Sequence, residues 1–231
     1  MLRREFTNIV RFMMDECFPA CIRDTRWFMW LPHKLAFGRN SKQLLDFKKY
    51  AHTLSYKEYQ KIYANLGASV IDRDTDLNEK CIYRIANNIK GKTVLDVGCG
   101  KGFLLKKLAK KHKATGADVY INPAIEKENA EIKFVKADLE QSLPFGNKAF
   151  DTVVCTHTLE HVRNLSKSIS ELRRVAKQRL IIVIPQQRYF KYTLDLHLNF
   201  FPYPEALQLV MGKKDSICEV VDGDLYYQEE L

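Results

Sequence analysis

Residues 92–102 read Lys-Thr-Val-Leu-Asp-Val-Gly-Cys-Gly-Lys-Gly, and this stretch decides the fold that the sequence predicts. Val94, Leu95 and Val97 form a short apolar run, which is typical of a buried β-strand. The Gly-x-Gly-x-Gly turn that follows has few Cβ atoms, so backbone N–H groups there can approach a ligand closely. A helical pattern begins at Phe103, and the positive end of that helix dipole points at the same turn.

An alternation of strand and helix continues from this turn to the C-terminal end. A glycine turn by itself also fits an ordinary strand–helix connection, but here it opens a series of apolar strands. Nearly continuous apolar strands between helices indicate a parallel sheet that is covered on both faces. Asp222-Gly223-Asp224 then marks a hairpin, which predicts an antiparallel end to the sheet. The predicted strands are 94–97, 114–119, 132–136, 150–155, 179–184, 217–221 and 225–227, and the predicted helices are 79–89, 103–109, 166–176 and 204–211.

Polar residues stand where three of these strands end. Asp118 closes the second strand, 22 positions beyond Asp96, a spacing that suits an acid bound to both hydroxyls of a ribose. Asp138 follows the third strand, where the base of a ligand would lie, and Thr156 and His157 end the fourth. Because the carboxyl ends of parallel strands share one edge, these residues predict a single ligand site.

Composition and charge narrow the class of protein. The chain has 231 residues, enough for one sizeable α/β domain with an N-terminal extension, and its formal net charge is +9. This charge fits nucleic acid or an anionic membrane, but most of the lysines fall on predicted helices, where a solvated face is the commoner explanation. The six cysteines are widely spaced without a CxxC pair, so reduced thiols in a cytoplasmic protein and no metal site are expected. The sequence has no run of about 18 apolar residues, so no membrane span is expected.

Residues 1–38 differ from the rest of the chain. Trp27 and Trp30, the only two tryptophans, stand among basic residues. Bulky aromatics beside arginines suit peripheral contact with the inner membrane surface, or a lid over a hydrophobic substrate. The alternative is a helical arm whose aromatic side chains are buried on the main domain. Residues 41–66 follow with an apolar periodicity that predicts one helix.

Four motifs, in this order and spacing, resemble the class I S-adenosylmethionine-dependent methyltransferases, especially those that modify quinones, lipids or sugars. They are residues 94–102, Gly116-Ala117-Asp118, Lys136-Ala137-Asp138-Leu139 and the segment 150–162. The resemblance implies a Rossmann-like α/β fold, with a doubly wound, mostly parallel sheet of seven strands whose last strand is antiparallel. It also implies S-adenosylmethionine as cofactor, bound by a domain of residues 79–231 behind a helical arm or lid of residues 1–78. A dinucleotide dehydrogenase is disfavoured because the turn lacks the GxGxxG spacing.

The resemblance assigns cofactor contacts to particular positions. The glycine turn and its neighbours would shape the site of the methionine end, while Asp118 and Val119 would meet the ribose. Asp138 and Leu139 would meet the adenine, and Thr156 and His157 would border the sulfonium. The residues assigned to the methionine end are Asp96, Gly98, Cys99, Gly100 and Gly102. The side chain of Cys99 reads as a small filler of the turn, not as a nucleophile.

Two histidines are candidates for the general base that a hydroxyl acceptor would require. His157 is the first, because an imidazole titrates near neutral pH and this one ends the fourth strand. His197 follows the fifth strand and is the second. For both histidines the alternative is a structural role without proton transfer. Tyr189, Phe190 and Tyr192 are candidates for the lining of the acceptor pocket.

The predicted activity is methyl transfer to a small molecule, with the hydroxyl of a sugar or of a lipid-linked compound as acceptor. A nucleic-acid or protein methyltransferase is one alternative, although an Asn-Pro-Pro-Tyr motif for base methylation is missing. A non-catalytic protein that binds the cofactor and acts through a partner is the other. Against it stand the intact glycine turn and both acids.

Overall fold

The chain forms two compact units in the computed structural model, which describes residues 9, 12–55, 57–59, 61–62, 74–192 and 194–231. The N-terminal unit comprises residues 1–73 together with 187–200, and the sheet unit comprises residues 74–186 and 201–231. The segment 187–200, which the sequence places after the fifth strand, thus groups with the N-terminal unit. The division into an arm of residues 1–78 and a domain of residues 79–231 stays a prediction.

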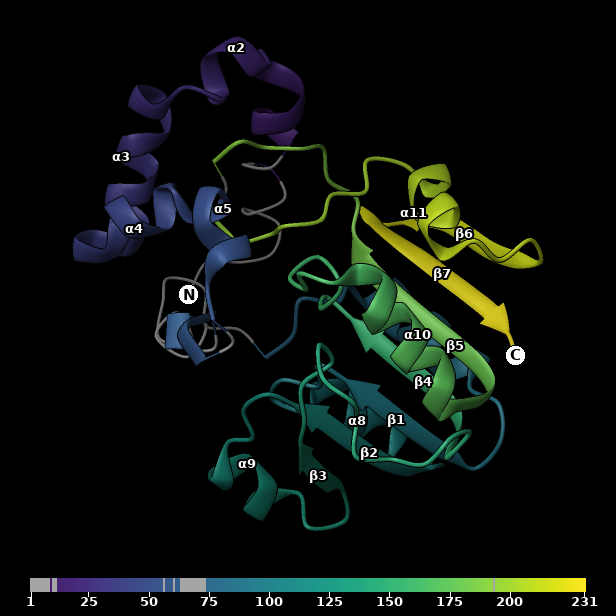
Figure 1. The fold of residues 1–231 in the computed structure, drawn as a ribbon. Coiled ribbons are helices and arrows are strands. Elements are labelled where there is room, and N and C mark those ends of the chain that lie inside the picture. Colours follow the sequence, from purple (N-terminus) through teal and green to yellow (C-terminus); the bar gives the residue numbers. More distant parts are fainter. Residues whose placement is uncertain (1–8, 10–11, 56, 60, 63–73, 193) are drawn as a thin grey trace. The chain divides into compact units, whose positions relative to one another are not determined.

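A seven-stranded sheet forms the core of the sheet unit, in the order β3-β2-β1-β4-β5-β7-β6 (Figure 1). β1 pairs in parallel with β2 and β4, whereas β7 is antiparallel to both β5 and β6. The mostly parallel sheet with an antiparallel last strand is therefore confirmed. The strands are β1 Thr93–Val97, β2 Lys113–Asp118, β3 Lys133–Lys136, β4 Phe150–Thr156, β5 Ala176–Pro185, β6 Ser216–Val221 and β7 Asp224–Glu230.

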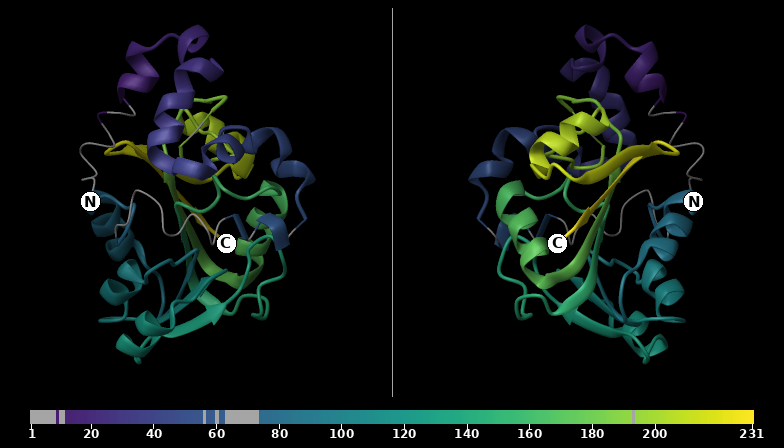
Figure 2. Two further views of the ribbon diagram at one scale, coloured as in Figure 1. Left: turned by 90° about the vertical axis from the view of Figure 1, so that its left-hand side faces the viewer. Right: turned by 90° about the vertical axis from the view of Figure 1, so that its right-hand side faces the viewer.

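Helices cover both faces of this sheet, which explains why its central strands are apolar on both sides (Figure 2). In β1, Val94 packs with α7 and α8 on one face, while Leu95 packs with α10 and α11 on the other. Both side chains are fully buried. The helices of the sheet unit are α7 Glu79–Asn88, α8 Phe103–Leu108, α9 Pro123–Glu128, α10 Leu165–Val175 and α11 Pro204–Met211.

The N-terminal unit consists of short helices in its described part. The predicted single helix over 41–66 is wrong, because the chain breaks at Asp46 and again after η3. The rings of Phe47 and Tyr59 lie 5.9 Å apart between centroids, whereas twelve residues of straight helix would span about 18 Å. Folding back thus gives both rings a common core; residues 56, 60 and 63–66 lie outside the described part. The elements are η1 Met13–Cys17, α2 Ala20–Arg23, α3 Arg26–Phe37, η2 Gly38–Asn40, α4 Ser41–Leu45, α5 Phe47–Tyr50 and η3 Ala51–Thr53.

Among the described residues, the helices are all too short or too polar to pass through a bilayer.

Asp151, near the start of β4, links this strand to the start of β1 through hydrogen bonds. Its Oδ2 accepts hydrogen bonds from the backbone N–H groups of Lys92 at 2.9 Å and Thr93 at 3.1 Å, and its Oδ1 accepts one from the Gln178 amide at 2.9 Å. These backbone hydrogen bonds hold the pKa of Asp151 well below its ordinary 3.8. A carboxylate with a lowered pKa stabilises the fold above the unfolded pKa, and this contribution is lost as the pH falls.

Replacing Asp151 with alanine is therefore expected to lower the free energy of unfolding by about 2 kcal/mol at neutral pH. The difference in the free energy of unfolding between the two proteins should shrink between about pH 5 and about pH 2, because the stabilisation by the ionised wild-type carboxylate is lost over this range. Urea denaturation of both proteins across this range measures it, with the exposed Asp215→Ala as control. A deficit that stays constant down to the lowest pH would contradict this account.

Candidate functional site

The glycine turn after β1 adopts a backbone that favours glycine at all three positions. Gly98, Gly100 and Gly102 have φ angles of 78°, 50° and 70°, in the left-handed region. A Cβ added at Gly98 would come within 2.0 Å of Thr158 Oγ1, whereas Gly100 faces open space. The turn is therefore a backbone-lined cradle with room above Gly100.

Asp118, at the end of β2, lies directly against this cradle. Its Oδ2 accepts a hydrogen bond from the Gly100 N–H at 2.8 Å, and its Oδ1 accepts one from the Tyr120 N–H at 3.1 Å. Burial raises the pKa of Asp118; these backbone hydrogen bonds oppose the rise, and the charge of Asp138 adds to it. Each carboxylate oxygen keeps a second lone pair, so Asp118 can both hold the turn and accept from a ligand hydroxyl.

Asp96, in β1, is a buried acid without an evident structural role. It is 2% exposed, and its Oδ1 has no hydrogen-bond partner among the described residues. Burial, together with the charge of Asp118, raises the pKa of Asp96 to about 7. A buried polar atom that lacks a partner is costly unless a ligand satisfies it. Asp96 is therefore suited to accept from a cationic donor such as an ammonium group.

The predicted adenine residues occupy the edge formed by β2 and β3. Asp138 Oδ1 accepts a hydrogen bond from the Glu140 N–H at 2.7 Å, which orients the carboxylate in a tight turn. The side chain of Leu139 is buried in the core below, so only its backbone is available to a ligand. Val119 follows β2 and is 37% exposed, which leaves it accessible beside Asp118.

Cys99 contributes backbone to the turn, not a reactive thiol. Its N–H donates to the Ala117 carbonyl at 3.2 Å, and its side chain packs with Leu105 and Phe134. Burial, with the nearby charges of Asp96 and Asp118, raises the pKa of the thiol far above its ordinary value. A thiol held neutral in this way is a poor nucleophile.

His157 lies just beyond β4, between two buried carboxylates. Its Nδ1 is 3.5 Å from Glu160 Oε1, and its Nε2 is 3.5 Å from Asp224 Oδ2. Burial alone lowers the pKa of His157, but the interactions with Asp224 and Glu160 outweigh burial and raise the pKa to about 10. His157 also has a φ of 47°, a left-handed conformation that is uncommon for a residue with a side chain. This environment favours a fixed imidazolium at neutral pH.

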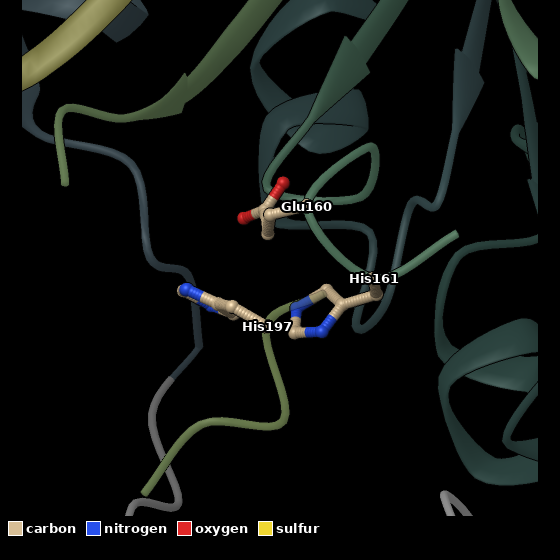
Figure 3. A group of neighbouring side chains, drawn as sticks. All are labelled: Glu160, His161 and His197. Atoms are coloured by element: carbon tan, nitrogen blue, oxygen red, sulfur yellow. The ribbon is translucent and has the colours of Figure 1, made fainter. Parts of the chain in front are cut away.

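The acids around His157 were not assigned to the site from the sequence. Glu160 and His161 belong to the turn after β4, and Figure 3 draws them with His197 of the N-terminal unit. Asp224 begins β7, and its Oδ2 also accepts a hydrogen bond from the Asn78 amide at 2.9 Å. In the sequence, Asp224 is part of the predicted hairpin turn. An acidic residue in a turn gives no sequence signal that shows whether it will be buried.

His197 and the aromatic residues of the segment 187–200 belong to the N-terminal unit. His197 Nδ1 lies 2.6 Å from Gln187 Oε1 and 3.2 Å from Asp195 Oδ2. These two contacts orient the imidazole ring, as a general base requires. The structure therefore places His157 and His197 in different electrostatic settings, which the sequence patterns do not distinguish.

The N-terminal unit also contains a shallow hollow, with a volume of about 170 Å³. Lys48 lines it, with its ammonium 5.0 Å from the ring centre of Tyr189 and 4.0 Å from that of Phe200. Burial lowers the pKa of Lys48 to about 8 despite the charges of Asp195 and Asp24. The lining residues are Leu45, Asp46, Lys48, Lys49, Tyr189, Lys191 and Tyr192. Of the predicted acceptor residues, Tyr189 and Tyr192 line this hollow.

The donor set at the carboxyl ends of β1 and β2 fits the cofactor that the motifs imply. Asp96 Oδ1, which has no hydrogen-bond partner in the part of the chain that the structure describes, suits the ammonium of a methionine end. The open face of Gly100 leaves room for it, and Asp118 is held in place to accept from the hydroxyls of a ribose.

Comparisons with known proteins identify the family of the chain. Residues 95–184 match the methyltransferase domain family. The protein MJ0638 of Methanocaldococcus jannaschii is 30% identical over 170 residues, which is 72% of this chain and 72% of that protein. The ubiquinone biosynthesis O-methyltransferase of Aliivibrio fischeri is 32% identical over half of each chain.

A solved structure agrees in fold. A SAM-dependent methyltransferase from Aquifex aeolicus superimposes with a TM-score of 0.50 and 21% identity, over 76% of this chain and 98% of that one. The strand order, the family match and these relatives thus agree with the motifs around the glycine turn. The chain belongs to the class I S-adenosylmethionine-dependent methyltransferases, and its cofactor is S-adenosylmethionine.

Proposed function

We propose that this methyltransferase acts on a hydroxyl group of a small acceptor that is lipid-linked or a sugar. The observation that carries the proposal is the similarity to a ubiquinone biosynthesis O-methyltransferase, an enzyme named for O-methylation in the synthesis of a quinone. The aromatic and lysine side chains around Tyr189 and Lys48 in the N-terminal unit agree with an acceptor that has both an apolar and a polar part.

Within the sheet unit, the proposed cofactor contacts divide by chemistry. Asp96 pairs with the ammonium of the methionine end, and Gly98, Gly100 and Gly102 let the backbone come close to it. Asp118 and Val119 contact the ribose, and Asp138 with the Leu139 backbone contacts the adenine. Thr156 and His157 border the reacting methyl. When bound, the cofactor supplies a methyl group on a positively charged sulfur, so the protein needs to align and desolvate the acceptor.

The proton of the acceptor hydroxyl requires a base when the oxygen takes the methyl group. We assign this proton to His197 Nε2, because Gln187 and Asp195 orient the ring through Nδ1. His157 is the less suited of the two predicted bases, since its pKa of about 10 keeps its ring protonated at neutral pH. In this proposal His157 is a positioning residue: a fixed positive charge that holds the turn after β4.

The proposed role of Asp118 predicts a loss of cofactor binding on substitution. Asp118→Ala removes the ribose acceptor and also the hydrogen bond to the Gly100 N–H. We expect affinity for S-adenosylmethionine to fall at least tenfold, which is about 1.4 kcal/mol. Calorimetric titration measures it, and Asp222→Ala, an acid exposed in the hairpin, is the matched control. Unchanged affinity in a folded Asp118→Ala protein would contradict the assignment.

The acceptor class is tested by label transfer from S-adenosylmethionine that carries a tritiated methyl group. Lipid extracts, sugar fractions, RNA and protein are offered separately, with the Asp118→Ala protein as the control with weakened cofactor binding. Base-stable label in a lipid or sugar fraction is the expected result. His197→Gln should then lower kcat, while the KM for the cofactor stays unchanged. Label that appears only in RNA or protein would refute the proposed acceptor.

A further inference from the structure

We propose that the outer face of helix α3 binds to an anionic membrane surface. This proposal concerns where the protein acts, and it does not depend on the identity of the methyl acceptor. The outer face of α3 is defined by the exposed side chains of Trp27, Trp30, Lys34 and two leucines, Leu31 and Leu35.

Among the described residues, the opposite side of α3 packs within its own unit. Met29 is 2% exposed and packs with Leu45 and Tyr192, and His33 is fully buried, with Nδ1 2.9 Å from the Met29 carbonyl. The outer face is instead strongly exposed: 73% for Trp27 and 78% for Leu35. A surface helix needs only one apolar side to pack on its own unit, so a second, exposed apolar side indicates a binding surface.

The outer face is a continuous apolar stripe, not a scatter of single side chains. Positions 27, 30, 31, 34 and 35 follow the i, i+3, i+4, i+7, i+8 spacing that places residues along one side of a helix. Four of the five are large and apolar, and the fifth is a lysine whose chain can reach past them. Two tryptophans with leucines and a basic residue are the composition of a helix that lies in the membrane interface.

The charge of the N-terminal unit selects an anionic surface. Residues 1–73 and 187–200 contain fifteen lysines and arginines against eight aspartates and glutamates, a net +7 of the chain's +9. The sheet unit, with 22 basic and 20 acidic residues, is nearly balanced. Exposed Arg39 and Lys42 follow directly after α3. Basic residues beside an interfacial helix attract anionic lipid headgroups.

The length of α3 agrees with lying on a bilayer. Its 12 residues extend about 18 Å, shorter than the hydrocarbon core of about 30 Å. The helix therefore inserts its outer face among the headgroups and leaves the rest of the unit in water.

Tryptophan fluorescence tests the proposal directly, because Trp27 and Trp30 are the only tryptophans of the chain and both belong to this face. Vesicles of phosphatidylglycerol and phosphatidylcholine in equal parts should shift the emission of the full chain to shorter wavelength. Brominated lipids in the same vesicles should quench it. The measurement needs neither cofactor nor acceptor, so it separates this proposal from the proposed acceptor.

A paired substitution gives the decisive comparison. Leu31→Glu with Leu35→Glu keeps both tryptophans as reporters and is expected to weaken vesicle partitioning at least tenfold. Leu209→Glu, at a leucine of α11 that is 84% exposed, is the matched control and should bind as the wild type does. Thermal unfolding checks that all three proteins are folded.

Four results would overturn the proposal or its selection for anionic lipid. The first is an unchanged emission spectrum with no co-sedimentation on anionic vesicles. The second is equal partitioning of the paired variant and the wild type. The third is a blue shift without lipid that accompanies a dimer in sedimentation analysis, since the face would then bind a second copy of the chain. Equal binding to pure phosphatidylcholine would overturn the selection for anionic lipid.

Discussion

Replacing Asp96 with asparagine is expected to stabilise the cofactor-free protein at about pH 8 and to weaken S-adenosylmethionine binding at least tenfold. Burial and the charge of Asp118 raise the pKa of Asp96 from 3.8 to about 7. At a pH low enough for the acid to be protonated in both the folded and the unfolded state, its raised pKa does not change the free energy of unfolding. It lowers stability as the pH rises from the unfolded to the folded pKa. This pKa difference corresponds to a loss of as much as about 4 kcal/mol in the free energy of unfolding.

The reason for the opposite effect on binding is that the ionised Asp96 is the form that pairs with the ammonium of the cofactor. In the wild type, the stabilisation by added cofactor should therefore grow between about pH 6 and about pH 8, and in Asp96→Asn it should not. Chemical denaturation with and without S-adenosylmethionine measures both effects, and calorimetry gives the affinity. The exposed Asp222→Asn is the matched control. An Asp96→Asn protein that is less stable at pH 8 and binds the cofactor normally would contradict the assignment.

Replacing His157 with asparagine is expected to lower the free energy of unfolding by about 3 kcal/mol at neutral pH. The variant removes the positive charge that faces Glu160 and Asp224, whose side chains are 1% and 0% exposed. Asparagine also tolerates the left-handed backbone at this position, so the change tests charge and not backbone strain.

The pH dependence of this deficit follows from the direction of the pKa shift. The folded-state pKa of His157 is raised from 6.5 to about 10. The stabilisation is therefore complete below about pH 6.5 and is lost as the pH rises towards 10. Urea denaturation between about pH 6 and about pH 9 should show the deficit of His157→Asn shrinking with pH. Replacing Glu160 with glutamine as well should recover part of the loss, and additive single losses would argue against the ion pair.

Much of the fold follows from local signals in the sequence. The strand before Gly98, the glycine turn and the apolar strands after it are each encoded within a few residues, and all form as predicted. The hairpin signal at Asp222-Gly223-Asp224 likewise predicts the antiparallel β6–β7 pair. The order of acids at the strand ends predicted Asp96 and Asp118 together, since the ends of neighbouring parallel strands share one edge.

Other features depend on contacts between residues far apart in the chain. The helix predicted over 41–66 fails because tertiary packing of Phe47 on Tyr59 outweighs local helical periodicity. Likewise, the apolar periodicity of α3 does not show which side of that helix packs within the unit, and Met29 and His33 decide it by being buried.

The sequence by itself determined the sheet, the glycine cradle and the family, because those depend on periodicity and on the short-range geometry of glycine. Only the tertiary structure decided the protonation of the site. Asp224 reaches His157 from a strand 67 positions later, and Asn78 binds Asp224 across 146 positions. The pKa of a side chain in the site is set by its burial and by the charges that face it. Both arise only when distant segments of the chain meet in a low-dielectric interior. That is why two histidines that look alike in the sequence differ in the folded chain: His157 faces two buried carboxylates, whereas His197 faces the oxygens of Gln187 and Asp195.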